Sequence, residues 1–575
     1  MARTRCSARE LISSTSPRNR TVTFGVCSPA DPRIDDASRK RASNIISMVA
    51  DTIAQNVRMP DGTPVDVVFS RTLIDNEKQA DMIARQFRQA QVDAIVCCPD
   101  TWAFAQLTMI SLLAQLPADT PVNITCGNSA PKPGVVFAHS INGALAQDGR
   151  LAALNVGSWP DTGAKPKMTP PTAEALIDWC YAAMTYAGLK GRRAVVFGHD
   201  SMGMETAMAH IIPTRNTFGL EITRLDMKLL SDMLTRGAYS RKELKQLDAW
   251  IREHVGKRLD LSQPNGERNY RRGLAMYLII RDLLADIDAV AGGFMNQLEW
   301  GSDPRCTPLP ICDIAESLLN TSFDHNGPKQ PLAFGTEADV QGVITMLVSS
   351  WLTGGNPPLF MDFRKVWEPA EIRTLARKLK TPFNSKTSWA KTGFVDGDNS
   401  GSASLDWAGR PGASVANIMK NVSMPGAELY YFPGGGNSVA FISPGGLKGI
   451  ASRLAYSELS GMFTMIWDEA ATISLPTRLA RAVARSSNIT WPHTWIVPKY
   501  ASMTEYKQYA PANHFHMIQD LPVARFQHWM DLTNVLSSTP WRKRPSFIEG
   551  VDRPLPLLHV LNGGSQSAKQ LRAGR

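Results

Sequence analysis

The stretch Pro331-Leu-Ala-Phe-Gly-Thr-Glu337 decides the fold class, because a short apolar strand ends at a carboxylate and the helix-like run 338–351 follows directly. Open α/β sheets place their functional groups at the carboxyl ends of such strands. A second acid, Asp362, follows one helix later in the equally apolar segment Pro358-Leu-Phe-Met-Asp-Phe-Arg364. We therefore expect Glu337 and Asp362 to serve one site, where two acids can share a cation.

Toward the N-terminus, residues 21–127 alternate short β-branched runs with amphipathic helical patterns. The predicted strands are 21–26, 65–70, 94–98 and 122–126, and the predicted helices between them include 37–55 and 77–91. This alternation predicts a parallel sheet with helices on both faces. The polar, Pro-rich stretch 157–171 then has the composition of a linker.

From Thr172 the pattern restarts, with Thr172 as the expected cap of a helix that Gly188 ends. Strands at 194–197, 220–225, 289–293 and 331–337 and helices at 240–254 and 270–286 continue this second unit. Beyond about residue 355 the chain changes to short strands and many Gly/Pro turns.

The expected fold class is α/β, with two doubly wound parallel-sheet domains followed by a β-rich C-terminal domain. We place the first domain at 21–170, the second at 171–355 with Glu337, and the third at 356–562 with Asp362 and His514. The ends, 1–20 and 563–575, are expected to be flexible and basic.

The composition narrows the function classes. The net charge is +10, but basic residues gather at the two ends, and no aromatic and basic residues interleave as a nucleic-acid groove requires. No run reaches the roughly 18 apolar residues of a membrane span. We expect no nucleic-acid or membrane partner. The Arg/Ser-rich N-terminus leaves an organellar transit peptide open as an alternative, against which Glu10 argues.

The eight cysteines, at 6, 27, 97, 98, 126, 180, 306 and 312, show no zinc-type spacing. They fall mainly in apolar contexts, which favours buried, reduced thiols in a cytoplasmic protein.

Three glycine-containing turns follow predicted strands, at 198–203, 399–403 and 432–436. None has the glycine spacing of a dinucleotide fingerprint or the lysine of a P-loop. We interpret them as tight turns, so a nucleotide-dependent enzyme remains an alternative that no phosphate motif supports.

Each candidate acid also has a purely structural interpretation. Glu337 can be a first-turn acid that complements a helix dipole, and Asp362 an edge-strand acid paired with a surface base. His514, in Ala512-Asn-His-Phe-His516, completes a possible set of ligands. Two carboxylates and one imidazole suit a hard or borderline divalent ion.

A dozen fragments spread over most of the chain carry a more specific signal. They include Trp102, Ser201-Met-Gly203, Leu319-Asn-Thr-Ser-Phe-Asp324, Thr336-Glu337, Phe360-Met-Asp362, Asn399-Ser-Gly-Ser-Ala403, Thr490-Trp-Pro492 and Ala512-Asn-His514. In their order and approximate spacing the chain resembles the L-fucose isomerase family, which also acts on D-arabinose. The resemblance places the family's two catalytic carboxylates on Glu337 and Asp362 and its metal-binding histidine on His514.

The resemblance implies an isomerase that interconverts an aldose and its 2-ketose through an enediol, with Mn²⁺ held by Glu337, Asp362 and His514. Such a reaction needs a base for the C2 proton, a proton route between O1 and O2, and stabilisation of the developing oxyanion. A divalent ion polarises both oxygens and keeps the two carboxylates ionised. The expected substrates are L-fucose and D-arabinose.

The resemblance further implies that Arg33, Ser400, Trp491 and Asn513 contact the open-chain sugar. Trp102 is expected to come from a neighbouring subunit, because the family forms homohexamers with sites at subunit boundaries.

Three positions depart from the family pattern. Cys27-Ser-Pro29 replaces its arginine-proline opening, Asn437 a tyrosine and Met295 a glutamine. A catalytically inactive sugar-binding relative is the remaining alternative, against which the retention of all three metal positions argues.

Overall fold

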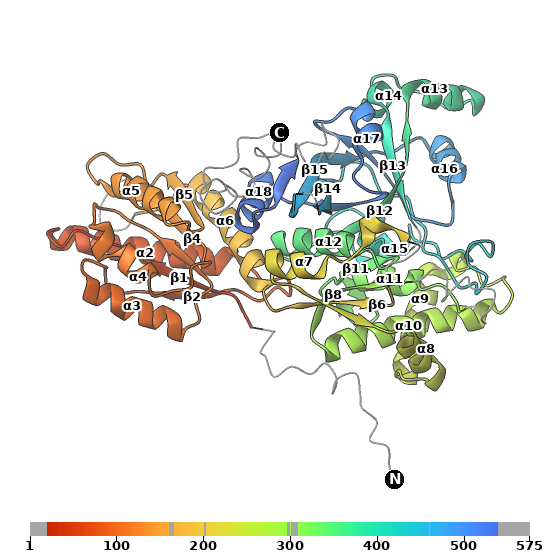
Figure 1. The fold of residues 1–575 in the computed structure, drawn as a ribbon. Coiled ribbons are helices and arrows are strands. Elements are labelled where there is room, and N and C mark those ends of the chain that lie inside the picture. The colour runs from red at the N-terminus through yellow and green to blue at the C-terminus, as the bar shows by residue number, and fades with distance from the viewer. Residues whose placement is uncertain are drawn as a thin grey trace, which may run out of the picture. The chain divides into compact units, whose positions relative to one another are not determined.

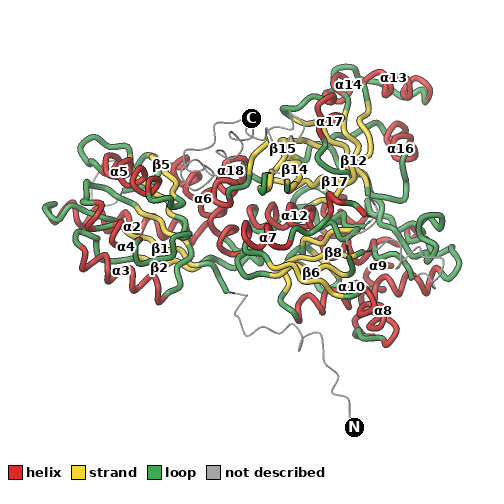
Figure 2. Tube along the Cα trace, viewed as in Figure 1, coloured by secondary structure: helices red, strands yellow, loops and turns green. Residues whose placement is uncertain are grey.

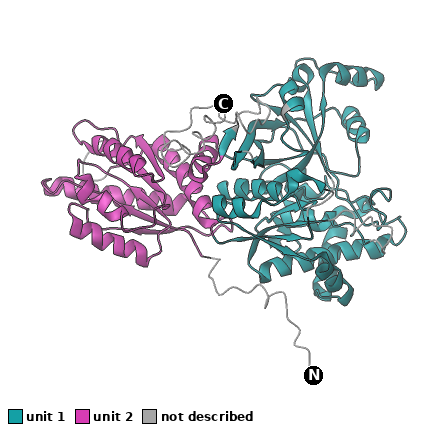
Figure 3. Ribbon diagram, viewed as in Figure 1, with its two compact units in different colours: residues 1–18, 191–521, 536–552 teal, residues 19–190, 522–535, 553–575 magenta. Residues whose placement is uncertain are grey.

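A computed structural model of the chain describes residues 20–159, 166–199, 203–295, 300, 309–399, 401–458 and 460–538. Within these residues the chain forms two compact units (Figure 3). The first comprises 20–190 and 522–535, and the second 191–521 and 536–538. Apart from Arg20, the predicted basic ends lie outside the described residues, as do Cys6 and Cys306.

The first unit contains a parallel sheet with strand order β2-β1-β3-β4-β5 (Figure 1). Its strands are β1 (Thr23–Cys27), β2 (Asp66–Phe69), β3 (Ala94–Cys97), β4 (Val122–Gly127) and β5 (Ala152–Gly157). Its helices are α2 (Asp36–Asn56), α3 (Glu77–Gln89), α4 (Met109–Leu113), α5 (Gly134–Gln147), α6 (Pro170–Gly188) and α18 (Val523–Thr533). The predicted doubly wound α/β arrangement is confirmed.

Local capping sets where these helices begin. The side chains of Asp35 and Asn76 accept hydrogen bonds from backbone N–H groups of the first turns of α2 and α3. The prediction that Thr172 caps α6 is wrong, because α6 begins at Pro170 and its N-cap is Thr169. The Thr172 hydroxyl instead accepts a 2.7 Å hydrogen bond from the Ser158 N–H.

The second unit begins with another parallel sheet, in the order β11-β8-β6-β7. Its strands are β6 (Arg193–Phe197), β7 (Glu221–Leu225), β8 (Ala289–Phe294) and β11 (Ala333–Thr336). The accompanying helices are α7 (Ile211–Phe218), α8 (Met227–Arg236), α9 (Arg241–Val255), α10 (Gly266–Asp286), α11 (Asp313–Asn320) and α12 (Val340–Leu352). A two-stranded ribbon, β9 (Phe323–Asp324) and β10 (Gly327–Pro328), precedes β11.

The same unit continues into a predominantly antiparallel sheet that closes on itself as a barrel, in the order β14-β17-β12-β13-β16-β15 and back to β14. Its strands are β12 (Leu359–Trp367), β13 (Phe394–Asp398), β14 (Lys448–Ser457), β15 (Met462–Thr472), β16 (His493–Pro498), β17 (His514–Gln519) and the added parallel strand β18 (Leu536–Ser538). Its helices are α13 (Pro369–Lys378), α14 (Ser388–Thr392), α15 (Val415–Met419), α16 (Thr477–Ser486) and α17 (Met503–Tyr509). Figure 2 shows these strands among long loops, which confirms the predicted β-rich C-terminal domain.

Helix α12 connects the parallel sheet to the barrel. Every residue of α12 is buried, and the helix packs on β8 and β11 as well as on β14 and β17. Its polar side chains are used internally, since Thr345 and Gln341 accept hydrogen bonds from backbone N–H groups of β14. The site described next lies where this helix begins.

Two further features concern the whole described chain. Its helices include none that is both long and apolar enough to cross a membrane. Its cysteines, at 27, 97, 98, 126, 180 and 312, are all buried and unpaired, as expected for reduced thiols.

Candidate active site

Glu337 lies directly after β11, at the carboxyl end of a fully buried parallel strand, as the sequence predicts. It is not a first-turn helical acid, because Glu337 and Ala338 both adopt left-handed backbone conformations, with φ of 56° and 52°. Such conformations are uncommon for residues with a Cβ and concentrate at functional sites. Asp339 then caps α12 by accepting a hydrogen bond from the Gly342 N–H. This bend leaves the Glu337 carboxylate at the edge of the sheet.

Strand register brings the other two predicted residues together. Strands β12 and β17 pair antiparallel, and Asp362 lies directly opposite His514. Asp362 is therefore on an interior strand, between β17 and β13, and its interpretation as an edge-strand acid is wrong. Directly opposed side chains of an antiparallel pair lie on the same face about 5 Å apart. The pairing thus fixes an imidazole beside a carboxylate although 152 positions separate them in sequence.

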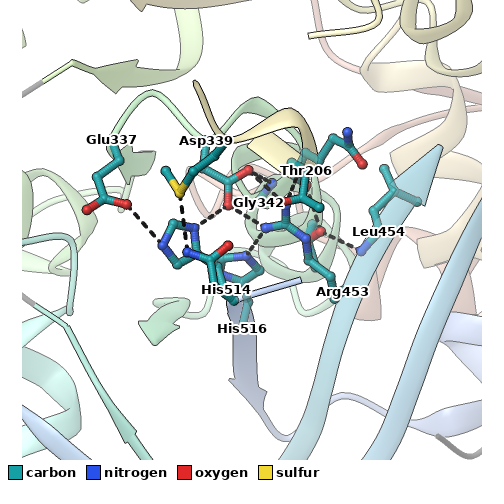
Figure 4. Close-up of polar contacts among 12 residues, drawn as sticks. Thr206, Glu337, Asp339, Gly342, Arg453, Leu454, His514 and His516 are labelled. Carbon is teal, nitrogen blue, oxygen red and sulfur yellow. Dashed lines mark hydrogen bonds and ion pairs between the residues drawn. The ribbon is translucent and has the colours of Figure 1, made fainter. Parts of the chain in front are cut away.

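The His514 imidazole is the centre of the cluster (Figure 4). Its Nε2 lies 3.1 Å from an oxygen of Glu337 and 3.3 Å from an oxygen of Asp362. Neither approach has the alignment of a hydrogen bond, so within the described part of the chain Nε2 is a buried nitrogen without a hydrogen-bond partner. The Glu337 and Asp362 side chains keep 11% and 23% of their surface exposed, and a ligand can reach them.

The other ring nitrogen is firmly held. Nδ1 of His514 donates a 2.8 Å hydrogen bond to Asp339, which is completely buried. Because a carboxylate only accepts, this contact keeps a proton on Nδ1, so in the neutral ring Nε2 is the nitrogen whose lone pair can bind a ligand. Histidine ligands of metal ions are typically oriented by such a second contact.

Asp339 is fixed in turn by Arg453, a buried arginine on β14 (Figure 4). The guanidinium contacts both Asp339 oxygens, through Nη1 and, at 3.0 Å, through Nη2. Arg453 Nη1 also lies 3.2 Å from Nε2 of His516. Gly342 closes the cluster, because a Cβ there would lie within 3 Å of Asp339, His516 and Arg453.

The charges around the histidines act in opposite directions. Burial alone would lower the pKa of His514, but the carboxylates of Asp339, Asp362 and Glu337 outweigh it and hold the pKa well above the usual value. Burial and then the Arg453 guanidinium hold the pKa of His516 well below its usual value. Burial alone would raise the pKa of Asp339, but Arg453 and then His514 keep it low, and Asp339 remains an anion.

The three predicted ligands have the chemistry that a divalent cation prefers. Two ligand atoms at right angles, each about 2.1 Å from an ion, are about 3 Å apart, and the Nε2 to oxygen distances are 3.1 and 3.3 Å. Among the described residues, no group of three or more His, Cys, Asp or Glu side chains is arranged to hold a metal ion. Binding a cation would therefore require these side chains to move.

The predicted sugar-binding residues do not all lie in the same unit as the three predicted metal ligands. Asn513 precedes His514, is exposed, and its backbone carbonyl accepts a 2.6 Å hydrogen bond from the Phe363 N–H. Trp491 is half-buried and lies 5.1 Å from the guanidinium of Arg364, whose Nη2 is 3.5 Å from Asp362. Ser400 lies outside the described residues.

Arg33 and Trp102 belong to the first unit and lie beyond the carboxyl ends of β1 and β3. Arg33 is 74% exposed and forms a 2.6 Å ion pair with Asp31. Trp102 is half-buried and packs edge-on against Phe137. Their roles at the site remain predictions.

The position where a tyrosine was expected has a structural role. Asn437 is buried, and its amide donates to the backbone carbonyls of Asp260 and Met424 at 2.7 and 3.0 Å. Its side chain is thus used within the scaffold.

Sequence reasoning missed Asp339, Arg453 and Arg364. Signals for two of them exist: Asp339 stands two residues after Glu337 at a helix start, and Arg453 interrupts an apolar strand. Their pairing could not be inferred, because 114 positions separate them.

Comparisons with known proteins point to one family. The family model described as the first N-terminal domain of L-fucose isomerase matches residues 21–191, and that of the second N-terminal domain matches residues 193–354. Curated proteins named L-fucose isomerase from Streptococcus pneumoniae strains Taiwan19F-14 and 70585 are each 26% identical over 501 residues, covering 81% of this chain and 82% of theirs. Two consecutive domain matches span more than half of the chain, and the similarity to the curated proteins covers 81% of it. The chain belongs to the L-fucose isomerase family.

Proposed function

We propose that this protein is a divalent-metal-dependent aldose–ketose isomerase that interconverts L-fucose and L-fuculose, and D-arabinose and D-ribulose. The observation that carries the proposal is the position of His514 Nε2, which faces Glu337 and Asp362 at 3.1 and 3.3 Å. The Asp339 contact presents this nitrogen in the tautomer that a cation requires. Membership of the L-fucose isomerase family supports the choice of sugar.

Glu337, Asp362 and His514 would hold the cation, with Mn²⁺ as the ion that the family resemblance suggests. When bound, a divalent ion supplies polarisation of the sugar's O1 and O2, which makes their protons easier to remove. Glu337 and Asp362 provide a base and an acid for moving a proton between C2 and C1 through an enediol. Their partial exposure lets both reach an open-chain sugar.

Arg364 places a positive charge next to Asp362. Its Nη2 lies 3.5 Å from Asp362, and its Nε donates a 2.7 Å hydrogen bond to the fully buried Asp398. A guanidinium anchored in this way places its positive charge beside Asp362.

The test is a direct assay of purified protein. After chelator treatment, L-fucose or D-arabinose is supplied with and without Mn²⁺, and ketose is quantified by NMR. We expect ketose only with the metal. Sugar binding without ketose would indicate a catalytically inactive relative. The absence of both sugar binding and turnover would refute the proposal.

We also infer that the protein works as a homo-oligomer, a hexamer by resemblance, in the cytoplasm and without a nucleic-acid or membrane partner. The buried, unpaired cysteines of the described residues support a reducing compartment. Light scattering on the purified protein tests the subunit number.

A further inference from the structure

A small cavity lies beside Arg364 in the barrel unit. Its volume is about 280 Å³, and Arg364, Glu428, Tyr431, Asn488 and Trp491 are among the residues that line it. This is close to the lower limit of pockets that enclose small molecules. The lining combines two aromatic rings with donors and an acceptor, which is the chemistry of a polyhydroxylated ligand.

Arg364 connects this cavity to the reacting groups. It is the extra residue of a β-bulge, because Phe363 pairs with Gly397 and Lys365 with Asp396 across β12 and β13. Bulges commonly redirect a side chain near a functional site. The guanidinium contacts Asp398 and Asp362 and lies over the Trp491 ring. Within the described residues its Nη1 makes no hydrogen bond, so one donor edge is available to a ligand.

Asn488 is a second donor with a fixed direction. Its Oδ1 accepts hydrogen bonds from the N–H and hydroxyl of Thr490 at 2.9 and 2.7 Å, which assigns the amide orientation. Its backbone carbonyl is bonded to Nε2 of His493 at 2.9 Å. The Asn488 side chain is buried, and its Nδ2 makes no hydrogen bond within the described chain. The Nδ2 group of Asn488 is therefore held in the cavity wall and can donate to a bound ligand.

The two aromatic residues of the cavity, Trp491 and Tyr431, differ in how tightly they are packed. Trp491 packs against the buried cluster of Ile311, Ala427 and Phe432, which holds its indole in place. Tyr431 is 52% exposed and also lines the cavity. Aromatic faces suit the C–H surfaces of a sugar chain, while the exposed carboxylate of Glu428 accepts from hydroxyl groups.

We propose that this cavity binds the polyol end of the aldose, meaning the carbons beyond the reacting C1 and C2. The inference rests on the proposed isomerase function and names the part of the protein that selects the substrate. Arg364 marks the boundary between the two regions, with Asp362 on the side of the reacting carbons. The hydroxyls of the distal carbons donate to Glu428 and accept from Asn488 Nδ2 and Arg364 Nη1.

The test uses substitutions that leave the metal ligands untouched. Asn488→Asp keeps the oxygen that Thr490 binds and replaces the Nδ2 donor with an acceptor. Tyr431→Ala removes the ring, and Tyr430→Ala is its matched control, because Tyr430 is 87% exposed and does not line the cavity. The values of KM and kcat are measured for L-fucose and D-arabinose.

We expect Asn488→Asp and Tyr431→Ala to raise KM about ten-fold with kcat within about two-fold, because they remove binding that is uniform along the reaction. Tyr430→Ala should match the wild type. Unchanged KM in both cavity variants, or a loss confined to kcat, would overturn the proposal.

Calorimetric titration with the sugar alcohol D-arabinitol separates this inference from the function itself. Binding about ten-fold weaker in Asn488→Asp than in the wild type supports the cavity even if no aldose is turned over. Equal binding contradicts it even if the enzyme is active. Thermal melts of each variant confirm that the fold is retained.

Discussion

His514 and Asp339 share a buried 2.8 Å hydrogen bond that joins the start of helix α12 to strand β17. Asp339 thereby performs two tasks, because the same carboxylate caps the helix and orients the imidazole. Arg453 neutralises it from the other side. The orientation of His514, the proposed metal ligand, thus depends on Asp339, which need not contact the metal ion or the sugar itself.

We predict that Asp339→Asn weakens both stability and metal binding. Asparagine caps a helix as well as aspartate does, but it leaves Arg453 as an uncompensated buried charge. Breaking a buried ion pair in this way costs about 3–5 kcal/mol, and losing the contact to a ligating histidine lowers metal affinity about 10–100-fold. Urea unfolding and Mn²⁺ titration measure the two effects.

The matched control is Asp226→Asn, since exposed Asp226 caps helix α8 in the same way. That variant should unfold within about 0.5 kcal/mol of the wild type. Equal stability loss in the two variants would mean that capping alone explains Asp339.

Glu337→Gln and Asp362→Asn should each lower turnover at least about 1,000-fold while leaving the oligomer intact. Both changes keep the shape of the side chain and remove the charge that proton transfer requires. The measurement is kcat for L-fucose, with light scattering to check assembly. Glu371→Gln, a half-exposed acid on α13, serves as control. A normal rate in either site variant refutes the role of that residue.

The position of Glu337 could be predicted from the sequence, because the pattern that indicates it lies within a few neighbouring residues. An apolar strand that ends at an acid before a helix places Glu337 at the edge of a parallel sheet, and β11 confirms this position. The strand and helix order of both parallel sheets follows from the same local alternation of patterns.

The rest depends on contacts between distant segments. Asp362 and His514 face one another only through the register of β12 and β17, and no local pattern encodes that pairing. The left-handed backbone at Glu337 and Ala338 is equally hidden, since neither residue favours it. At Thr172 a local pattern was misleading. This residue is suited to cap a helix, but its hydroxyl accepts a hydrogen bond from the Ser158 N–H instead.

Gly342→Ala should destabilise the protein by about 2 kcal/mol or more. An added Cβ would lie 2.6 Å from Asp339, 2.7 Å from His516 and 2.9 Å from Arg453, and overpacking a buried cluster costs about 1–3 kcal/mol. Gly143→Ala is the control, because this helical glycine in α5 has open space around its Cβ position.

In Gly143→Ala the higher helix propensity of alanine should raise stability by about 0.5–1 kcal/mol. Differential scanning calorimetry compares the two variants. A stable Gly342→Ala protein with normal activity would show that the cluster is loosely packed.

The pair of Glu243 and Arg281 should make stability pH-dependent. Hydrogen bonds from Arg281 at 2.6 and 3.0 Å lower the pKa of Glu243 to about 2. Because the pKa is lower in the folded state, the stabilisation is complete above pH 4.5 and is lost as the pH falls toward 2. Glu243→Gln should therefore be less stable than the wild type at pH 7, by about 2 kcal/mol.

The difference between the two proteins should shrink progressively below pH 4.5. Chemical unfolding at pH 7, 4 and 3 provides the measurement. A gap that stays constant over this range would show that charge does not contribute to the interaction.

The central claim is that Glu337, Asp362 and His514 hold one divalent cation on which aldose isomerisation depends. Its most direct test is a titration of chelator-treated protein with Mn²⁺, with bound metal and the rate of ketose formation from L-fucose measured on the same samples. We predict that the rate rises in proportion to bound Mn²⁺ and saturates at one ion per chain, and that His514→Ala shows neither binding nor turnover. Full activity in the metal-free protein, or unchanged Mn²⁺ binding in His514→Ala, would contradict the claim.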